Sequence, residues 1–500
     1  MSRSRRRVGP AHLASIALDA ASTQPLNRQL YFAIREAILD ARLQPGTRLP
    51  STRALAADLD VSRNTVMAAF EQLFAEGYIE GKVGAGSFVS RELPEETLHA
   101  RAALVAGRAS GGSAPGLSAR GAYLASLREA GSRPRAFSPG LPELAAFPFE
   151  EWSRLMAKHW RDPPRSFLIG GDPAGHKPLR EAIAAYLGAA RAVSCTPDQV
   201  FVVSGAQQAL DLTARVLIDP GDRVWIEEPG YPGLRGALIA NGAELAPVPV
   251  DSEGLDVEAG RSIAPHARMA CVSPSHQYPL GTTMSLSRRL ALLEWASAAD
   301  AFVLEDDYDS EYRYAGKPLA ALQGLDADGR VVYVGTMSKV MFPGLRLGYM
   351  VVPQHLVPAF RAVRGLADTH PPMSIQPALA EFIEAGHLSA HIRRMRALYA
   401  DRQRLLLEAC RSQLSTWLEA MPDEAGMHLV AALRPGLDDR TVARTAREHG
   451  VEAPALSSYY RSLPPRQGLL LGYAGVGEAE IATATKRLAE ACAAAERLPV

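Results

Sequence analysis

Val331-Val-Tyr-Val-Gly-Thr-Met-Ser-Lys339 is an apolar strand pattern that runs into two hydroxyl residues and a lysine, and Pro343-Gly-Leu-Arg346 follows it closely. An amine at the end of a buried strand can form a Schiff base with an aldehyde. The hydroxyls of Thr336 and Ser338, together with the Arg346 guanidinium, can hold a phosphate. The stretch therefore predicts a site for an aldehyde cofactor at Lys339, on a strand of an α/β fold.

From about Ala136 onward, short apolar runs alternate with longer segments of helical periodicity. Strands interleaved with helices predict a mainly parallel sheet with both faces covered. The part beyond about Pro353 is rich in helix, and we expect it to form a smaller lid domain. The predicted strands begin near Val200, Arg223, Met269, Ala301 and Val331, with two more at 428–433 and 468–473 of the lid.

Polar or aromatic residues follow several of these strands. Ser204-Gly205-Ala206-Gln207 opens a helix whose free backbone amides can cradle a phosphate, although many strand-to-helix turns look alike. Tyr231 follows the next strand and can stack on a pyridine ring, although a lone tyrosine is more often packing. His276 follows a third strand, where a structural hydrogen bond is the simpler interpretation.

Glu305-Asp306-Asp307-Tyr308-Asp309 follows the apolar pair Val303-Leu304 directly. A carboxylate at the end of a buried strand can keep a pyridinium nitrogen protonated, and this turns the ring into an electron sink. Tyr308 can donate to a phenolate oxygen of the same ring. A solvated acidic loop is the alternative, and the buried strand immediately before it weighs against that interpretation.

The overall composition excludes several classes of protein. The chain has 500 residues and no net charge, and its four cysteines form no CxxC pair, so we expect no disulfide framework and no metal site. No apolar run approaches the ~18 residues of a membrane span. We therefore expect a multidomain cytoplasmic protein without a membrane partner. The arginine-rich start at 1–8 indicates a disordered tail rather than a DNA-gripping arm.

A separate unit precedes this α/β part. Leu26, Leu30, Ile34 and Ile38 recur at helical spacing, and Ser51 and Ser62 are each placed to cap a following short helix. Two short helices joined by a tight turn suit docking in a DNA major groove. Tyr78 to Val89 then reads as two strands around a glycine-rich tip, which is a wing suited to the minor groove. A helical bundle with no nucleic-acid partner is the alternative.

Charge permits DNA binding in this unit without establishing it. Residues 1–91 hold twelve Lys and Arg against eight Asp and Glu, and four of the twelve lie in the tail. The string from Gly46 to Val66, continued by 73–79, resembles the winged helix of the GntR family of bacterial regulators. That resemblance implies DNA contacts by Arg53, Ser62, Arg63, Asn64, Thr65, Lys82 and Gly84.

Residues 136–500 resemble the fold-type I aminotransferases that bind pyridoxal 5'-phosphate (PLP). The resemblance implies that Lys339 forms the Schiff base, that Asp306 pairs with the pyridine nitrogen and that Tyr308 binds the ring oxygen. It also implies that Tyr231 stacks on the ring, with His276 as a further residue of the cofactor site. The phosphate would be held by Gly205, Ala206, Gln207, Thr336, Ser338 and Arg346.

A GntR winged helix fused to such a domain resembles the MocR family of regulators, as do the strings at 275–279 and 305–309. The expected domains are a winged helix-turn-helix at 24–91, a flexible linker at 92–135, and an aminotransferase-like part at 136–500 with a large α/β domain and a smaller C-terminal α+β domain. The family implies a domain-swapped homodimer that binds double-stranded operator DNA. PLP itself, or an amine that displaces Lys339 from the aldimine, would be the effector.

Two other functions stay open at this stage. One is a working aminotransferase with an appended DNA-binding domain, and the other is a constitutive DNA binder in which PLP is structural. Three departures from the aminotransferase pattern weaken the first. Tyr278 replaces the usual asparagine before Pro-x-Gly, and no tyrosine precedes the turn at 170–173. The arginine expected to bind a substrate carboxylate is replaced by Leu470, with Arg466 only a nearby candidate.

Overall fold

The computed structural model describes residues 16–19, 21–82, 85–91, 93, 116–126, 134–315, 319–462 and 464–497. The chain divides into two compact units, Met1–Gly116 and Leu117–Val500. The predicted tail at 1–8 and the predicted DNA contact at Gly84 lie outside the described residues, as does most of the predicted linker. Within that linker, α5 (Ala119–Ser126) is helical, and Arg120 donates a hydrogen bond to the backbone oxygen of Ala240.

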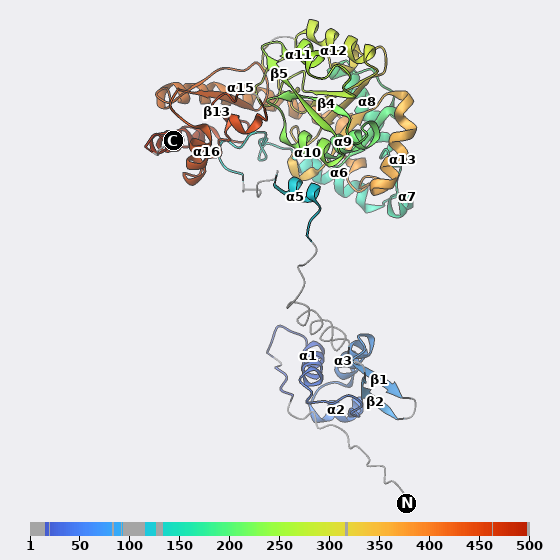
Figure 1. The fold of residues 1–500 in the computed structure, drawn as a ribbon. Coiled ribbons are helices and arrows are strands. Elements are labelled where there is room, and N and C mark those ends of the chain that lie inside the picture. The colour runs from blue at the N-terminus through green and yellow to red at the C-terminus, as the bar shows by residue number, and fades with distance from the viewer. Residues whose placement is uncertain are drawn as a thin grey trace, which may run out of the picture. The chain divides into compact units, whose positions relative to one another are not determined.

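The first unit is a helical bundle with a β-hairpin (Figure 1). Its elements are α1 (Leu26–Leu39), α2 (Thr52–Asp58), α3 (Arg63–Ala75), β1 (Ile79–Lys82) and β2 (Gly86–Val89). The apolar stripe of α1 packs against Phe70 and Leu73 of α3 in a closed core. The two strands pair antiparallel, with Ile79 opposite Val89. These elements confirm the predicted helices and wing.

An eight-stranded sheet organises the second unit, in the order β3-β10-β9-β8-β7-β4-β5-β6. Its strands are β3 (Val200–Val203), β4 (Arg223–Glu228), β5 (Glu244–Asp251), β6 (Gly254–Leu255), β7 (Met269–Val272), β8 (Phe302–Asp307), β9 (Val331–Thr336) and β10 (Gly348–Val351). Neighbours from β9 to β5 run parallel, as predicted, whereas β10 is antiparallel to both β3 and β9.

Helices cover both faces of this sheet. On one face, α9 (Ala206–Leu217), α10 (Pro232–Ala240) and α13 (Val357–Asp368) close a core around β3, β4 and β9. On the other face, α11 (Val257–Ile263) and α12 (Leu286–Ala298) enclose the stacked rings of Trp225 and Trp295, and α8 (Lys177–Arg191) packs near β3. The apolar residues of β9 alternate between the two faces, as a fully covered strand requires.

One predicted boundary is wrong. We expected the smaller domain to begin near Pro353, but α13 packs on α9, and α14 (Gln376–Glu384) packs on α8 and on α6 (Phe149–Arg161). These helices therefore belong to the layers around the large sheet. Their amphipathic periodicity could not reveal this, because a helix covering a sheet and a helix in a lid have the same pattern.

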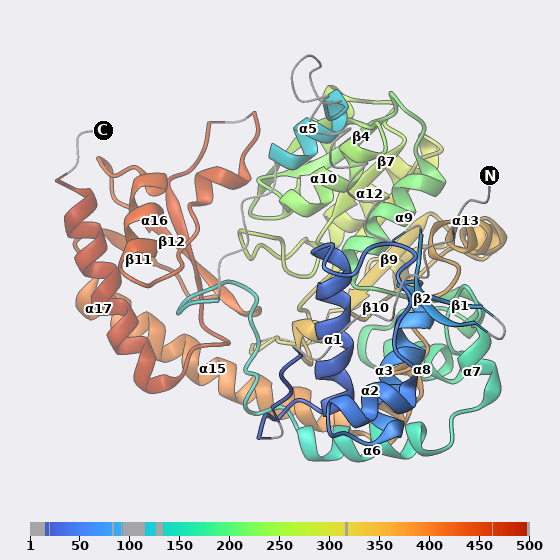
Figure 2. The ribbon, with the colours of Figure 1, turned by 90° about the horizontal axis from the view of Figure 1, so that it is seen from below.

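The smaller domain follows α15 (His387–Gln413), a long helix that runs from the large sheet toward the C-terminal elements (Figure 2). Its antiparallel sheet has the order β11-β12-β13. The elements are β11 (Leu418–Ala420), β12 (His428–Leu433), β13 (Gly468–Gly472), α16 (Asp439–Glu448) and α17 (Glu478–Ala495). The predicted strands at 428–433 and 468–473 are confirmed.

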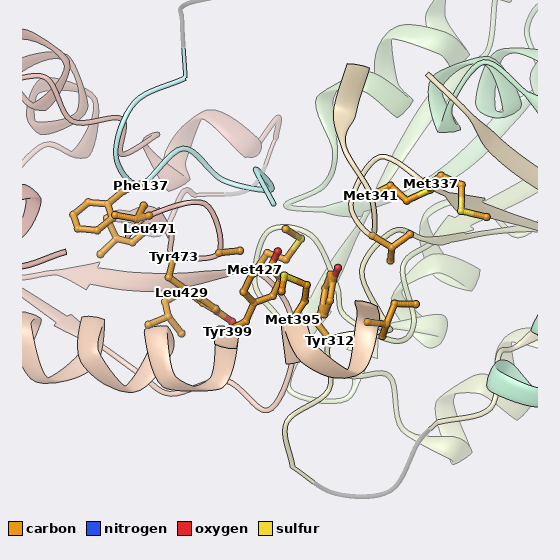
Figure 3. Packing of buried hydrophobic residues seen from close by; sticks show 14 of the residues in the cluster. Phe137, Tyr312, Met337, Met341, Met395, Tyr399, Met427, Leu429, Leu471 and Tyr473 are labelled. Atoms are coloured by element: carbon orange, nitrogen blue, oxygen red, sulfur yellow. The ribbon is translucent and has the colours of Figure 1, made fainter. Parts of the chain in front are cut away.

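A continuous apolar core joins the two domains of the second unit. Met337 and Met341, on either side of Lys339, belong to the same cluster as Leu429 and Leu471 of the smaller domain. Figure 3 shows Tyr312, Met395 and Tyr399 lying between them. Because interiors are close-packed, a shift of the smaller domain would displace side chains that pack beside Lys339.

Candidate functional site

The predicted cofactor residues gather at one edge of the large sheet. Thr336 ends β9, Asp306 and Asp307 end β8, and Gly348 of β10 pairs with both Val203 and Thr336. The segments 204–207 and 336–339 therefore follow strand ends that meet on either side of β10. Polar groups from separate parts of the chain converge there because parallel strands end at the same edge.

Lys339 extends its amine toward a segment far away in the sequence. Its Nζ donates to the backbone oxygen of Gly140 at 2.8 Å. Desolvation lowers the pKa of the Lys339 amine, while Asp309 and Asp306 oppose this effect. Gly140 has φ +69°, a conformation that favours glycine, and a Cβ there would force the Lys339 amine to shift. Sequence reasoning missed Gly140 because nothing local marks it.

Asp306 is a buried carboxyl that forms no ion pair with any described residue, although it senses the charge of Lys339. The residue is 8% exposed, and its Oδ1 accepts no hydrogen bond among the described residues. Burial, reinforced by Asp307 and Asp309, raises the pKa of Asp306 to about 7. An unpaired buried carboxyl is costly, so its retention indicates a partner supplied from outside the chain.

The predicted phosphate residues surround the start of α9. Gly205 is the N-cap residue with φ +93°, and Ala206 and Gln207 form the first turn. The Nη2 atom of Arg346 donates to the backbone oxygen of Ser204 at 2.9 Å, which places the guanidinium beside that turn. Thr336 Oγ1 accepts from the Ser338 amide at 3.1 Å. Free amides at a helix start, with an arginine beside them, suit a phosphate.

Tyr308 and His276 belong to one buried network. His276 Nδ1 lies 2.9 Å from the Tyr308 hydroxyl and 3.1 Å from Asp309 Oδ1. Its Nε2 lies 3.2 Å from Asp423 Oδ2, which belongs to the loop before β12. Although burial lowers the pKa of His276, Asp309 and Asp423 raise it overall to about 10, so the ring is an imidazolium at neutral pH. The network links the end of β8 to the smaller domain.

Tyr231 is 38% exposed and borders a small cavity whose lining includes Asp306, Glu227 and Arg235. The cavity places an aromatic ring, two carboxyls and an arginine around one space. Burial raises the pKa of Glu227 to about 8. Sequence reasoning missed Arg235, although its position four residues after Tyr231, the N-cap residue of α10, was the available signal.

The substitution at the expected carboxylate-binding position is a buried apolar one. Leu470 is fully buried against Leu456 and Tyr459 and offers no donor. Arg466, the nearby candidate, lines a different cavity with Asp251 and Glu419. The ring of Tyr278 packs edge-on against Tyr231 and Tyr308. The described residues thus include the cofactor set, but no arginine stands at the usual carboxylate-binding position.

In the first unit, the described residues that are predicted to contact DNA are exposed, except for the half-buried Thr65. Arg63 and Asn64 are exposed at the start of α3, and Arg53 is exposed on α2. Lys82 ends β1 with Nζ 5.1 Å from the centre of the Phe88 ring. Arg48 forms an isolated backbone β-bridge with Phe88 at the base of the wing. This surface presents guanidinium groups at a helix start, as major-groove readers do.

Ser62 caps α3, and Thr65 is its partner. Ser62 Oγ accepts from the Thr65 amide at 3.1 Å and lies 2.8 Å from Thr65 Oγ1. We expect Ser62→Ala to lower the stability of the winged helix by ~1 kcal/mol, the usual cost of a lost N-cap, while Ser62→Asn retains the cap. Chemical denaturation followed by circular dichroism measures this. Equal stability of the two variants would contradict the capping role.

Comparison with known proteins agrees with both halves of this architecture. Residues 26–89 match the gntR family of bacterial regulatory proteins, and residues 143–488 match aminotransferase class I and II. The chain is 44% identical, over 92% of both chains, to "Probable rhizopine catabolism regulatory protein MocR" of Rhizobium meliloti. It is 31% identical to the pyridoxine biosynthesis transcriptional regulator PdxR of Corynebacterium glutamicum, over 92% of this chain and 94% of the relative.

The second unit also resembles solved aminotransferases. Kynurenine aminotransferase of Pyrococcus horikoshii, solved with PMP, aligns with a TM-score of 0.67 and 29% identity, over 77% of this chain and 96% of that one. Fold and comparisons together define a DNA-binding transcriptional regulator with an aminotransferase-like domain. The chain belongs to the MocR family of such regulators.

PLP is the cofactor of the aminotransferase-like domain. The unpartnered Asp306 oxygen, the desolvated Lys339 amine and the cradle at the start of α9 fit its ring nitrogen, aldehyde and phosphate. In the described part of the chain, no helix combines the length and apolar character that a membrane crossing needs. Among the same residues, no group of His, Cys, Asp or Glu is arranged to hold a metal ion.

Proposed function

We propose that this regulator senses PLP, or an amino compound that competes with Lys339 for it, and converts occupancy into a change of DNA affinity. When bound, PLP supplies an aldehyde that reacts reversibly with primary amines. The observation that carries the proposal is the juxtaposition of the Lys339 amine, the unpaired Asp306 carboxyl and Tyr308 in a chain that also has a winged helix.

Each predicted site residue has a proposed role. Lys339 provides the covalent link, Asp306 holds the proton of the ring nitrogen and Tyr308 donates to the ring oxygen. Tyr231 stacks on the ring, and His276 positions Tyr308. The phosphate is bound by Gly205, Ala206, Gln207, Thr336, Ser338 and Arg346, and DNA is contacted by Arg53, Ser62, Arg63, Asn64, Thr65, Lys82 and Gly84.

The hydrogen bonds of His276 support a route for the coupling. The Tyr308 hydroxyl lies against the His276 imidazolium, and the same ring holds Asp423 of the smaller domain. If the hydroxyl exchanged His276 for the cofactor, the hydrogen bonding of the ring, and with it the contact to Asp423, would change. An effector can shift a conformational equilibrium only by its differential affinity for the two states. We propose that the smaller domain moves with occupancy, and that the linker at 92–135 passes the change from the domain at 136–500 to the one at 24–91.

We also propose that the aminotransferase-like part forms a homodimer, domain-swapped as in its family. Leu168 and Ile169 of α7 (Arg165–Ile169) are 63% and 77% exposed, and Leu366 of α13 is 89% exposed. Such exposure of large apolar side chains is expected where a second copy covers them. Two winged helices per dimer would raise the affinity for a two-site operator.

A spectral titration of the PLP-loaded protein with a panel of amines, run beside a turnover assay, tests the sensing function. A sensor gives a saturable shift of the cofactor absorption with an amine but no continuing formation of keto acid. A working aminotransferase, the alternative, gives steady conversion of amino and keto acids. The buried Leu470 favours the sensor, because its apolar side chain cannot bind the substrate carboxylate that the usual arginine would hold.

The independence of the two units can be tested at Arg63. We expect Arg63→Ala to weaken operator binding by ~1–3 kcal/mol, the usual value of an arginine contact to a base edge or phosphate, without changing PLP binding. Fluorescence anisotropy with labelled operator and the visible spectrum measure the two effects. Arg42→Ala is the control, because Arg42 pairs with Asp40 on the surface. Loss of PLP binding in Arg63→Ala would contradict the independence of the units.

A further inference from the structure

A further cavity, of about 500 Å³, lies behind the segment that carries Tyr308. Three elements meet there: the end of α8, the chain after β8 and the first turns of α15. Its lining includes Tyr186, Arg191, Ser310, Glu311, Arg393 and Arg396. Lys339, Asp306 and Arg346 do not line it, so it is separate from the cofactor cleft.

Several hydrogen-bond donors of this cavity lack partners. Arg393 makes no hydrogen bond or ion pair with any described residue. Arg396 uses Nε and Nη2 on the backbone oxygen of Glu311, at 3.0 and 2.7 Å, and no described group accepts from its Nη1. Ser310 Oγ is buried and likewise has no partner among the described residues. Arg393 and Arg396 are exposed, so their guanidinium groups are open to a ligand, whereas a buried hydroxyl such as that of Ser310 normally has a partner.

Arg191, which also lines the cavity, is an arginine whose hydrogen bonds are all made within the protein. Arg191 donates to Asp307 at 2.9 Å, to Ser275 at 2.7 Å and to the backbone oxygen of Leu319 at 2.6 Å. Each of its nitrogens is therefore engaged within the protein. Arg393 and Arg396 differ, because they lie three residues apart on one helix face with no carboxylate between them. Like charges in that arrangement are destabilising unless an anion joins them.

The carboxyl opposite the arginines does not neutralise them. Glu311 accepts from the Tyr186 hydroxyl at 3.2 Å, and its carboxyl forms no ion pair with Arg393 or Arg396. Burial and the charge of Asp307 raise the pKa of Glu311 to about 7. Near neutral pH, part of this carboxyl population is protonated and can donate to an anion. The lining also holds more cations than carboxyls: Arg191 and Arg313 are paired with Asp307 and Glu424, and Arg393 and Arg396 stand against Glu311 alone, so the cavity is positive.

We propose that this cavity binds a small organic anion through Arg393, Arg396 and the Ser310 hydroxyl. The ligand carries a carboxylate or phosphate group, since these oxyanions accept from guanidinium groups. The volume lies within the ~300–1,000 Å³ of small-molecule sites, so the ligand also has an organic portion. Ser310 follows Tyr308 by two residues, so an occupant would contact the segment that forms the cofactor site.

Isothermal titration of the PLP-loaded full chain with inorganic phosphate and with succinate, at constant ionic strength, tests the proposal. Bound PLP keeps its own phosphate cradle filled. We expect saturable binding of at least one probe, and the preferred probe identifies the headgroup as phosphate or carboxylate. Arg393→Gln and Arg396→Gln should each weaken binding by about tenfold or more, because each removes charge-assisted hydrogen bonds.

Arg404→Gln is the matched control on α15, because Arg404 pairs with Glu408 at the surface and does not line the cavity. It should bind the probe like the wild type. Thermal unfolding without anion checks that every variant is folded. The proposal is overturned if neither probe binds saturably, or if both cavity variants retain wild-type affinity. Binding that depends on Arg346 instead would place the anion in the cofactor cleft and would equally refute it.

Discussion

Alanine in place of Lys339 is expected to abolish the visible absorption band that the wild-type protein gives with PLP, while the fold stays intact. Lys339 presents its Nζ beside the Gly140 carbonyl, and desolvation lowers the pKa of the amine, which favours the unprotonated, nucleophilic form. Removing this side chain relieves desolvation and leaves the apolar contacts of Met337 and Met341 in place.

The spectra of wild type and Lys339→Ala, each with added PLP, measure this effect directly. Lys177→Ala is the control, since Lys177 is exposed and faces Glu181 on α8. Circular dichroism checks the fold of both variants. A band of wild-type intensity in Lys339→Ala would assign the covalent link to another amine, and absence of a band in the wild type would remove the cofactor from the account.

Asparagine in place of Asp306 is expected to stabilise the cofactor-free protein at pH 8 and to weaken its affinity for PLP. The folded-state pKa of Asp306 is raised from 3.8 to about 7, so the folded state holds this proton more tightly than the unfolded state does. Stability is therefore lost as pH rises between these two values, by up to ~4 kcal/mol for three pKa units. Because asparagine cannot ionise, the variant does not lose this stability as the pH rises.

Urea denaturation at pH 4 and pH 8 measures the first effect, which should be present only at pH 8. Loss of a charged hydrogen bond to the ring nitrogen should weaken PLP binding by about ten- to a hundredfold. Glu305→Gln is the control for affinity, because Glu305 accepts from the amides of Leu322 and Gln323 instead. If Asp306→Asn left PLP affinity unchanged, Asp306 would have no role at the ring.

Much of the cofactor site was predictable because its residues follow apolar strands directly. Asp306 and Thr336 each end a run that is buried on both faces, and parallel strands bring such ends together. The helix caps at Ser51 and Ser62 were predictable for a similar reason, since a cap is read over three or four residues.

The contacts that sequence reasoning missed depend on pairing across long separations. Gly140 and Lys339 are 199 residues apart, and His276 and Asp423 are 147 apart. The antiparallel strand at 348–351 was also missed, because its direction is set by its neighbours rather than by its composition. Similarly, only the packing of α14 on α8 shows that 376–384 belong to the large domain.

The central claim is that occupancy at Lys339 controls DNA binding. The direct test is operator affinity of the PLP-loaded wild type and of Lys339→Ala, measured by fluorescence anisotropy with and without the amine that shifts the wild-type spectrum. The account predicts a change of affinity with the amine in the wild type and its loss in Lys339→Ala. An unchanged response in Lys339→Ala, or wild-type affinity indifferent to both PLP and amine, would contradict it.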